Sequence, residues 1–193
     1  MAKKVLGILG SPRLEGNTAD LLEAALEGAR SAGAKTERLA LARLSIDACI
    51  ECRRCDMNAE CAVKTDDMQE IYSRIRKVDA MVLASPIFFM SVSAQTKAMI
   101  DRCQSYWVER YIHRRRAYEG RERPKGLFVA CAGSSREMIF DPAKHVVKAF
   151  FAAIDYQYAG EVLLGFTDDP DLAPRKETAI EQARLAGESL VGP

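Results

Sequence analysis

The stretch KKVLGILGSPRLEGNTADLL, from Lys3 to Leu22, contains a complete strand–loop–helix pattern. The apolar run Val5 to Leu9 is typical of a short strand that is buried on both faces. Gly10-Ser11-Pro12 interrupts this run, a polar loop follows, and the apolar spacing after Asn17 predicts a helix. The first amides of a helix have no internal partner and lie at the positive end of its dipole. We therefore expect an anion-binding site at this loop.

Four side chains in and beside the loop can donate hydrogen bonds to an anion: Ser11, Arg13, Asn17 and Thr18. Such a set suits a terminal phosphate that carries about two negative charges. An ordinary βα turn with a polar cap is the alternative, because short motifs often match by chance. The stretch contains neither G-x-x-x-x-G-K-[ST] nor G-x-G-x-x-G, which disfavours nucleoside triphosphate and dinucleotide sites.

The residues Gly10-Ser11-Pro12-Arg13, followed by Gly16-Asn17-Thr18, resemble the FMN-phosphate loop of the NADPH-dependent FMN reductase family. The resemblance implies a flavodoxin-like fold and an FMN cofactor, with NAD(P)H as a candidate reductant. It also implies that the flavin carries the redox chemistry, so no side chain is assigned a catalytic role.

Length and composition set further bounds. The 193 residues fit one domain, with a cysteine-rich insertion at about 45–65. Lys plus Arg is 28 and Asp plus Glu is 27, so the net charge of +1 gives no argument for binding nucleic acid or a membrane. The first residues lack the pattern of a signal peptide, and no apolar run is long enough to span a bilayer. We expect a cytoplasmic protein.

Apolar periodicity predicts four more strands, at residues 36–41, 80–84, 127–132 and 158–164. Helices are expected at 18–31, after a capping box of Asp66 and Gln69, at 93–103, at 142–153, and at 175–190 with Pro174 as N1. Strands that alternate with helices indicate parallel βαβ units. The expected fold class is α/β, a flavodoxin-like doubly wound sheet of five parallel strands in the order 2-1-3-4-5. Ligands of such sheets bind at the carboxyl ends of the strands, where the loops Ser11–Thr18, Ser85–Ser91 and Ala132–Ser135 would converge.

The second of these loops is apolar although it is expected at the mouth of a crevice. It follows the third strand, which Ser85-Pro86 is expected to end, and it contains Pro86, Ile87, Phe88, Phe89, Met90 and Ser91. Exposed aromatic side chains are costly unless a flat group such as a flavin ring covers them, or unless they face the core or a subunit interface. With Val92–Gln95, Lys97 and Asp101-Arg102 after it, the loop is similar to the flavin-ring loop of the same family.

Two residues depart from the family pattern. Phe88 stands where tyrosine is common, so a hydroxyl contact to flavin or substrate would be missing. Met90 stands where the family commonly has glycine, and a positive φ there would strain a methionine. The third loop, Gly133-Ser134-Ser135-Arg136, matches the family loosely, and the resemblance assigns Gly133 to the cofactor.

Four of the six cysteines form the pattern C-x2-C-x2-C-x5-C, at Cys49, Cys52, Cys55 and Cys61. Without a secretion signal, metal or redox chemistry is a better expectation than a disulfide framework. Such close spacing favours a [4Fe–4S] cluster, because one short loop can offer each iron a thiolate. Zinc and free or disulfide-bonded thiols remain alternatives. The spacing resembles the compact cysteine motif of the iron–sulfur flavoproteins, a branch of the same family.

The cysteine segment follows the second strand, so we expect it at the same sheet edge as the flavin loops. Arg53, Arg54 and Lys64 flank the cysteines and would raise the potential of a cluster, unless they are simply solvated. Cys103 and Cys131 are expected to be small buried side chains rather than ligands.

The basic segment Trp107–Arg116 is expected to be a solvated face or a subunit interface, with an anionic partner or a cofactor phosphate as the alternative. His113 and His145 have no evident catalytic partner, and the acidic run Asp168–Asp171 lacks EF-hand spacing.

These observations indicate an iron–sulfur flavoprotein, a flavin-dependent oxidoreductase. Electrons would pass from a ferredoxin-like donor through a [4Fe–4S] cluster to FMN, and on to oxygen, peroxide, a quinone or a protein. One alternative is an NAD(P)H-dependent FMN or quinone reductase without a cluster. Another is a zinc-binding interaction protein on the same fold. The family resemblance further suggests a homodimer or homotetramer.

Overall fold

A computed structural model describes residues 2–134 and 138–192, which build a parallel sheet between two layers of helices. The sheet order is β2-β1-β3-β5-β6. The strands are β1 (Lys4–Leu9), β2 (Lys35–Ala40), β3 (Ala80–Phe88), β5 (Lys125–Cys131) and β6 (Gln157–Leu164). A two-residue strand, β4 (Ser91–Val92), pairs antiparallel with the end of β3. With β4 set apart, this is the predicted order 2-1-3-4-5.

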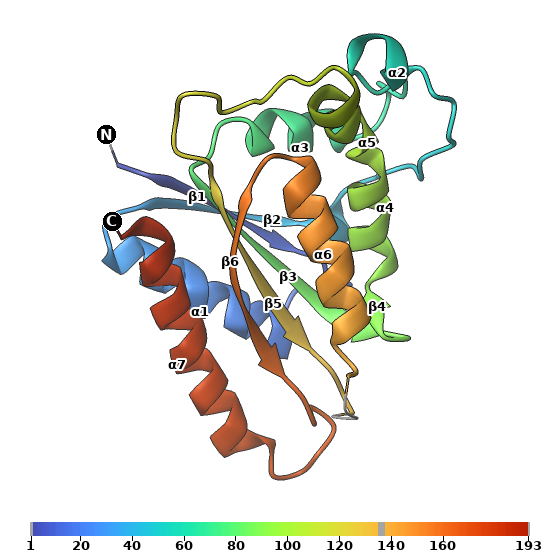
Figure 1. The fold of residues 1–193 in the computed structure, drawn as a ribbon. Coiled ribbons are helices and arrows are strands. Elements are labelled where there is room, and N and C mark those ends of the chain that lie inside the picture. The colour runs from blue at the N-terminus through green and yellow to red at the C-terminus, as the bar shows by residue number, and fades with distance from the viewer. Residues whose placement is uncertain (1, 135–137, 193) are drawn as a thin grey trace.

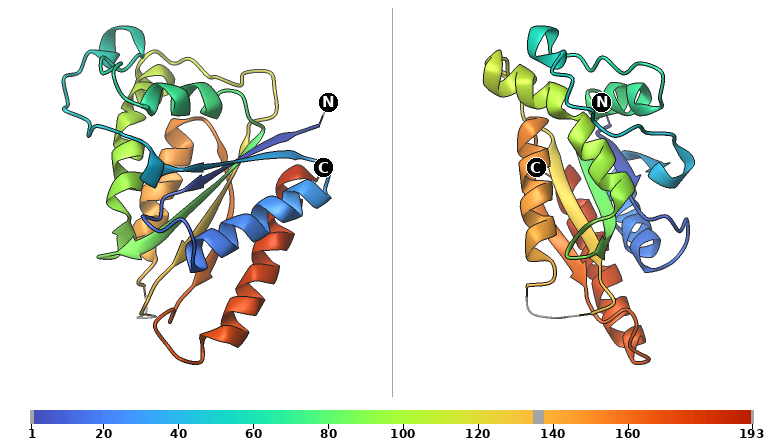
Figure 2. Two further views of the ribbon diagram at one scale, coloured as in Figure 1. Left: turned by 180° about the vertical axis from the view of Figure 1, so that it is seen from behind. Right: turned by 90° about the vertical axis from the view of Figure 1, so that its right-hand side faces the viewer.

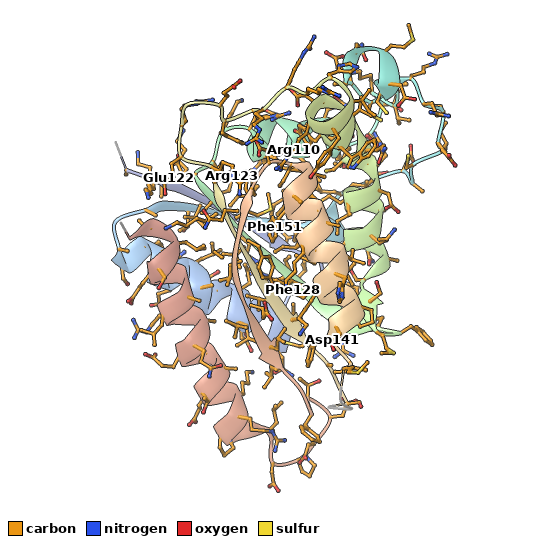
Figure 3. All side chains as sticks on the ribbon, viewed as in Figure 1. Arg110, Glu122, Arg123, Phe128, Asp141 and Phe151 are labelled. Carbon is orange, nitrogen blue, oxygen red and sulfur yellow. The ribbon has the colours of Figure 1, made fainter. Side chains whose placement is uncertain are left out.

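The helices divide between the two faces of the sheet (Figures 1 and 2). On one face lie α1 (Asn17–Ser31) and α7 (Leu172–Val191), which share a core with residues such as Leu9 and Val82. On the other face lie α3 (Met68–Ile75), α4 (Ala94–Arg102) and α6 (Asp141–Ala153). Figure 3 shows Phe128 of β5 and Phe151 of α6 in this second core, and both are fully buried.

Four short elements complete the described chain. They are η1 (Leu41–Arg43), α2 (Cys55–Asn58), α5 (Gln104–Trp107) and the π-helical turn η2 (Val108–Ile112). The turns α2 and η2 lie side by side above the sheet (Figure 1). No helix in the described part of the chain has the length and apolar character needed to cross a bilayer.

Helices α1 and α7, which lie on the same face of the sheet, approach each other very closely. A Cβ atom at Gly28 of α1 would lie 1.9 Å from the carbonyl oxygen of Arg184, and one at Gly187 of α7 would lie 1.9 Å from that of Ala25. Real Cβ atoms do not approach backbone oxygens so closely, so only glycine fits at either position without moving a helix.

Three expectations about element boundaries were wrong. Strand β3 continues through Ser85-Pro86 to Phe88, beyond the last residue of β3 that pairs with β1, Ala84. The missing N–H of Pro86 therefore costs no ladder bond on that side. Helix α7 begins at Leu172, three residues early, so Pro174 is its third residue, where a helix needs no N–H either.

The third error concerns the capping box that Asp66 and Gln69 were expected to form. The Gln69 side chain instead donates a hydrogen bond to the Val63 carbonyl oxygen (3.0 Å), and the Asp66 carboxylate pairs with Arg102. The Asp66 carboxylate still accepts a hydrogen bond from the Met68 amide (3.3 Å) at the start of α3, but its main partner is a distant arginine and not a reciprocal capping box.

Candidate functional site

The predicted phosphate loop begins at a glycine that is tightly enclosed. The Gly10 amide donates to the Ala84 carbonyl oxygen (2.7 Å), and the Ser93 hydroxyl donates to the Gly10 carbonyl oxygen. A Cβ atom at Gly10 would lie 1.8 Å from Oγ1 of Thr96. The start of the loop is therefore fixed between β3 and the first turn of α4.

The loop ends at the first residues of α1, where Gly16 is the N-cap residue with φ of 115° and has no side chain to cap the helix. Asn17 is half-buried and Thr18 is buried. Ser11 accepts a hydrogen bond from the Arg13 amide (3.1 Å), and the exposed Arg13 side chain makes no ion pair with any described residue. Uncapped helix amides beside an available guanidinium fit an anion such as the FMN phosphate.

Thr18 also contacts a cysteine that the sequence placed in the core. Burial raises the pKa of Cys131 to about 11, although a hydrogen bond with Thr18 and the charge of Lys176 oppose this rise. Cys131 and Cys103 are both buried, as predicted, so neither belongs to the exposed cysteine segment.

The apolar loop forms a tight hairpin. Ile87 pairs with Val92 and Phe88 pairs with Ser91, which leaves Phe89 and Met90 as the two turn residues. Both have positive φ, 49° and 62°, as the type I′ turn of a two-residue hairpin requires. The position of Met90 therefore does demand the conformation that glycine adopts most easily.

The tip of this hairpin is open to solvent. The exposed fractions are 49% for Phe88, 104% for Phe89 and 41% for Met90, whereas Ile87 is buried. The base is held by a hydrogen bond from the Ser93 amide to the buried Ser85 hydroxyl (3.0 Å). A rigid base with an exposed apolar tip suits contact with a flat ring.

The described part of the third loop, Ala132 to Ser134, follows β5 at the carboxyl edge of the sheet, where β1 and β3 also end (Figure 1). The Ala132 amide donates to the Leu164 carbonyl oxygen (2.9 Å), which holds the loop against the end of β6. A Cβ atom at Gly133 would lie 2.2 Å from the Asp168 carboxylate, so a larger residue here would have to displace this exposed side chain. The sequence had assigned Asp168 no contact here. Ser135 and Arg136 lie outside the described residues.

The cysteine segment lies elsewhere. Cys49, Cys52, Cys55 and Cys61 line one cavity of about 1060 Å³, together with Arg102 and Cys103 at the end of α4. The β3–β4 hairpin lies before the first turn of α4, and the nine residues of this helix rise about 13 Å. The expectation that both sites share one edge of the sheet is therefore wrong for a single chain.

Arg102 explains this placement. Its side chain is completely buried, with an exposed fraction of 0%, and it pairs with Asp66, whose exposed fraction is 3%. It donates to the carbonyl oxygens of Asp47 (3.0 Å) and Val63 (3.1 Å), which flank the cysteines on either side. Its Nε donates to Sγ of Cys61 (3.3 Å). One side chain thus holds both ends of the segment against α4.

Charge and burial act on the neighbouring groups. Burial alone would raise the pKa of Asp66, but the hydrogen bond and charge of Arg102 hold it below its usual value. Burial and the Asp56 carboxylate raise the pKa of the Cys55 thiol, and Cys61 and Cys49 add to this rise.

The donor set of the segment has the chemistry of an iron–sulfur site. Four thiols surround one cavity, and left-handed Arg53 (φ 56°) precedes right-handed Arg54, an alternation that can direct successive amides toward an anion. Within residues 2–134 and 138–192, no three His, Cys, Asp or Glu side chains converge closely enough to hold a metal ion. Metal binding would therefore have to draw the exposed Cys49 and Cys52 inward.

Comparison with known proteins places this geometry in context. The sequence model of the family described as NADPH-dependent FMN reductase matches residues 3–166. An iron–sulfur flavoprotein of Archaeoglobus fulgidus is 40% identical over 103 residues, which cover 53% of this chain and 46% of that protein. One of Methanocaldococcus jannaschii is 41% identical over 99 residues, 51% of each chain. The chain thus spans about half the length of these curated relatives.

Solved structures show the same fold. The NAD(P)H:quinone oxidoreductase from Methanothermobacter marburgensis superposes with a TM-score of 0.76 at 22% identity, covering 100% of this chain and 98% of that one. An azoreductase from Bacillus anthracis gives a TM-score of 0.69 at 14% identity, covering 98% and 100%. At these identities the likeness concerns the fold alone.

Proposed function

The chain belongs to the NADPH-dependent FMN reductase family, and from this premise we propose that it is a flavin-dependent oxidoreductase that binds FMN at the carboxyl edge of the sheet. The observation that carries the proposal is the uncapped start of α1 beside the exposed tip of the β3–β4 hairpin. We assign the phosphate to Ser11, Arg13, Asn17 and Thr18. We assign the ring to residues 86–91 and Gly133.

The residues of the site have separable roles. Arg13 supplies the charge that balances the phosphate, and the amides after Gly16 supply fixed donors. The hydrogen bonds of Ser85 and Ser93 hold the hairpin, so the ring would meet a surface that is already ordered. Bound flavin would supply the transfer of electrons singly or in pairs.

We further propose that Cys49, Cys52, Cys55 and Cys61 hold a [4Fe–4S] cluster. The spacing of the thiols supports this, as do curated relatives that are named iron–sulfur flavoproteins. Electrons would enter from a ferredoxin-like donor, pass from cluster to FMN, and leave to oxygen, peroxide, a quinone or a protein. We propose a cytoplasmic, single-domain chain that forms a homodimer or homotetramer.

The first experiment measures iron, acid-labile sulfide and flavin per subunit in protein purified without oxygen. We expect about four irons, four sulfides and one FMN. Cys52→Ser with Cys55→Ser should lose the iron and keep the flavin. The control Cys131→Ala, which lies outside the cysteine segment, should keep the iron. If the double variant retained wild-type iron, the cluster assignment would fail.

A second candidate is an NAD(P)H-dependent FMN or quinone reductase without a cluster. It is favoured by the absence, in the described part of the chain, of three side chains converged for metal binding. It predicts FMN without iron, and rapid flavin reduction by NADPH alone. Stoichiometric zinc without flavin would instead indicate the zinc-binding interaction protein.

A further inference from the structure

Exposed apolar side chains gather beside the cysteine segment. Ile50 and Met57 lie on the segment, and Met57 is 84% exposed; Trp107, Tyr111 and Ile112 lie on α5 and η2. The rings of Trp107 and Tyr111 are 5.6 Å apart. We call these five side chains the apolar centre. Large exposed apolar clusters on a protein surface usually mark a contact with another molecule.

The structure joins the two parts of this surface. A ring nitrogen of His113, Nε2, lies 2.9 Å from the carbonyl oxygen of Asp56, so the end of η2 is linked to α2. Arg110 pairs with the buried Asp155 (3.1 Å), and Glu109 pairs with Arg76. Internal ion pairs thus hold Glu109 and Arg110 in place within the basic segment Trp107–Arg116. These pairs account for only part of the positive charge of the segment.

Four exposed arginines are close in sequence to the residues of the apolar centre, and we call them the arginine rim. Arg54, Arg114, Arg115 and Arg116 are exposed, and none makes an ion pair with a described residue. Arg53, by contrast, pairs with Asp56 (3.0 Å). The segments that carry the apolar centre therefore also carry four exposed positive charges that no described carboxylate pairs with. The sequence predicted that the basic segment Trp107–Arg116 is a solvated face. In the structure, the exposed and unpaired charges of that segment are those of Arg114, Arg115 and Arg116.

The surface lies directly over the cysteines. Ile50, Trp107 and Ile112 line the same cavity as Cys49, Cys52, Cys55 and Cys61. A partner that binds to the apolar centre would therefore lie close to the sulfur atoms of these four cysteines. Tryptophan, tyrosine, methionine and arginine are the residues enriched where proteins bind one another, and a positive rim accelerates association with a negative partner.

We propose that the apolar centre and its arginine rim are the docking surface for an acidic iron–sulfur electron carrier. The inference rests on the proposed function, since it supplies the place where the donor of that function would bind. In the step it serves, one electron leaves the reduced carrier, which becomes oxidised, and the cluster-bearing chain gains that electron. A second copy of this chain is a weaker candidate, because its net charge of +1 offers no overall attraction to a positive rim.

The test reverses the rim charge with Arg114→Glu, Arg115→Glu and Arg116→Glu in the full chain. The matched control carries Lys4→Glu, Lys35→Glu and Lys77→Glu, three reversals at exposed cations that lie outside the rim and make no ion pair with a described residue. A reduced, acidic two-cluster ferredoxin is mixed anaerobically with each protein, and cluster bleaching is followed by stopped flow. Salt is varied from about 0.01 to 1 M, which shortens the Debye length from about 30 to 3 Å.

We expect the wild-type rate to fall about tenfold or more with salt, within the range known for electrostatic steering. The triple variant should already be about tenfold slower at low salt and nearly insensitive to it, whereas the control should behave like wild type. Direct reduction by dithionite should be the same in all three proteins. A triple variant with the wild-type rate and salt dependence would overturn the inference, as would an equal loss in the control.

Two further readouts separate this inference from the proposed function. Wild-type protein without iron would refute the cluster, whereas calorimetric binding of oxidised ferredoxin needs no electron transfer and still reports docking. That binding should be lost in the triple variant and retained in the control. Trp107→Glu should leave the oligomeric state unchanged; if it dissociates an oligomer, the surface is an interface between copies and the inference is wrong.

Discussion

Replacing Arg102 by methionine would test how the cysteine segment is held. The change removes five hydrogen bonds, one of them to Cys61 Sγ, and leaves the Asp66 carboxylate buried without its partner. Breaking a buried ion pair by removing one partner costs about 3–5 kcal/mol. For a chain of this size we therefore expect Tm to fall by about 10 °C.

The assay is thermal and urea unfolding of the metal-free chain, followed by iron analysis after reconstitution. The second variant, Arg102→Met with Asp66→Asn, leaves no unpaired buried charge and should recover part of the lost stability. Arg102→Lys keeps a charge but not the planar fork, so it should lie between wild type and Arg102→Met. A loss below about 1 kcal/mol, the net value of one ordinary hydrogen bond, would refute the anchoring role of Arg102.

Three other predictions concern the flavin edge. Met90→Gly should raise the free energy of unfolding by about 0.5–1 kcal/mol, because it relieves a left-handed methionine at the cost of glycine entropy; a lower Tm would contradict this. Gly10→Ala should destabilise the chain by about 1–3 kcal/mol through its clash with Thr96, and Thr96→Ala should restore part of the loss in unfolding experiments. Arg13→Ala should weaken FMN binding about tenfold, or 1.4 kcal/mol, in a fluorescence titration. The Tm of the flavin-free Arg13→Ala chain should match wild type, since this side chain is exposed.

The sheet was predictable from the sequence because its signals are local. Strands that are buried on both faces appear in the sequence as apolar runs. Their alternation with helices predicts that neighbouring strands pair in parallel. The proposed phosphate loop rests on the same kind of local signal, since Gly10 through Thr18 form one continuous pattern, and its role in binding stays a prediction.

The position of the cysteine segment was not predictable in this way. It depends on Arg102, which lies 36 residues after Asp66 and looks like an ordinary helix-terminal cation in the sequence. The positive φ of Met90 was raised as a question by the family pattern but could not be decided, because the residue type argues against the conformation that the hairpin imposes. Contacts between residues far apart in the sequence decided the first outcome, and the two-residue length of the hairpin turn decided the second.

Helix α7 lies outside the matched region, which ends at residue 166, yet it packs against the helix that begins at the proposed FMN site. Its Gly187 lies against α1, and its Lys176 pairs with Asp20 (2.6 Å) in the first turn of α1. The helix whose first amides we assign to the phosphate is thus supported by a helix to which the proposal assigns no part of the cofactor. Substitutions that enlarge Gly187 would shift α7 against α1, and we expect them to lower the affinity for FMN although no binding-site motif contains this residue.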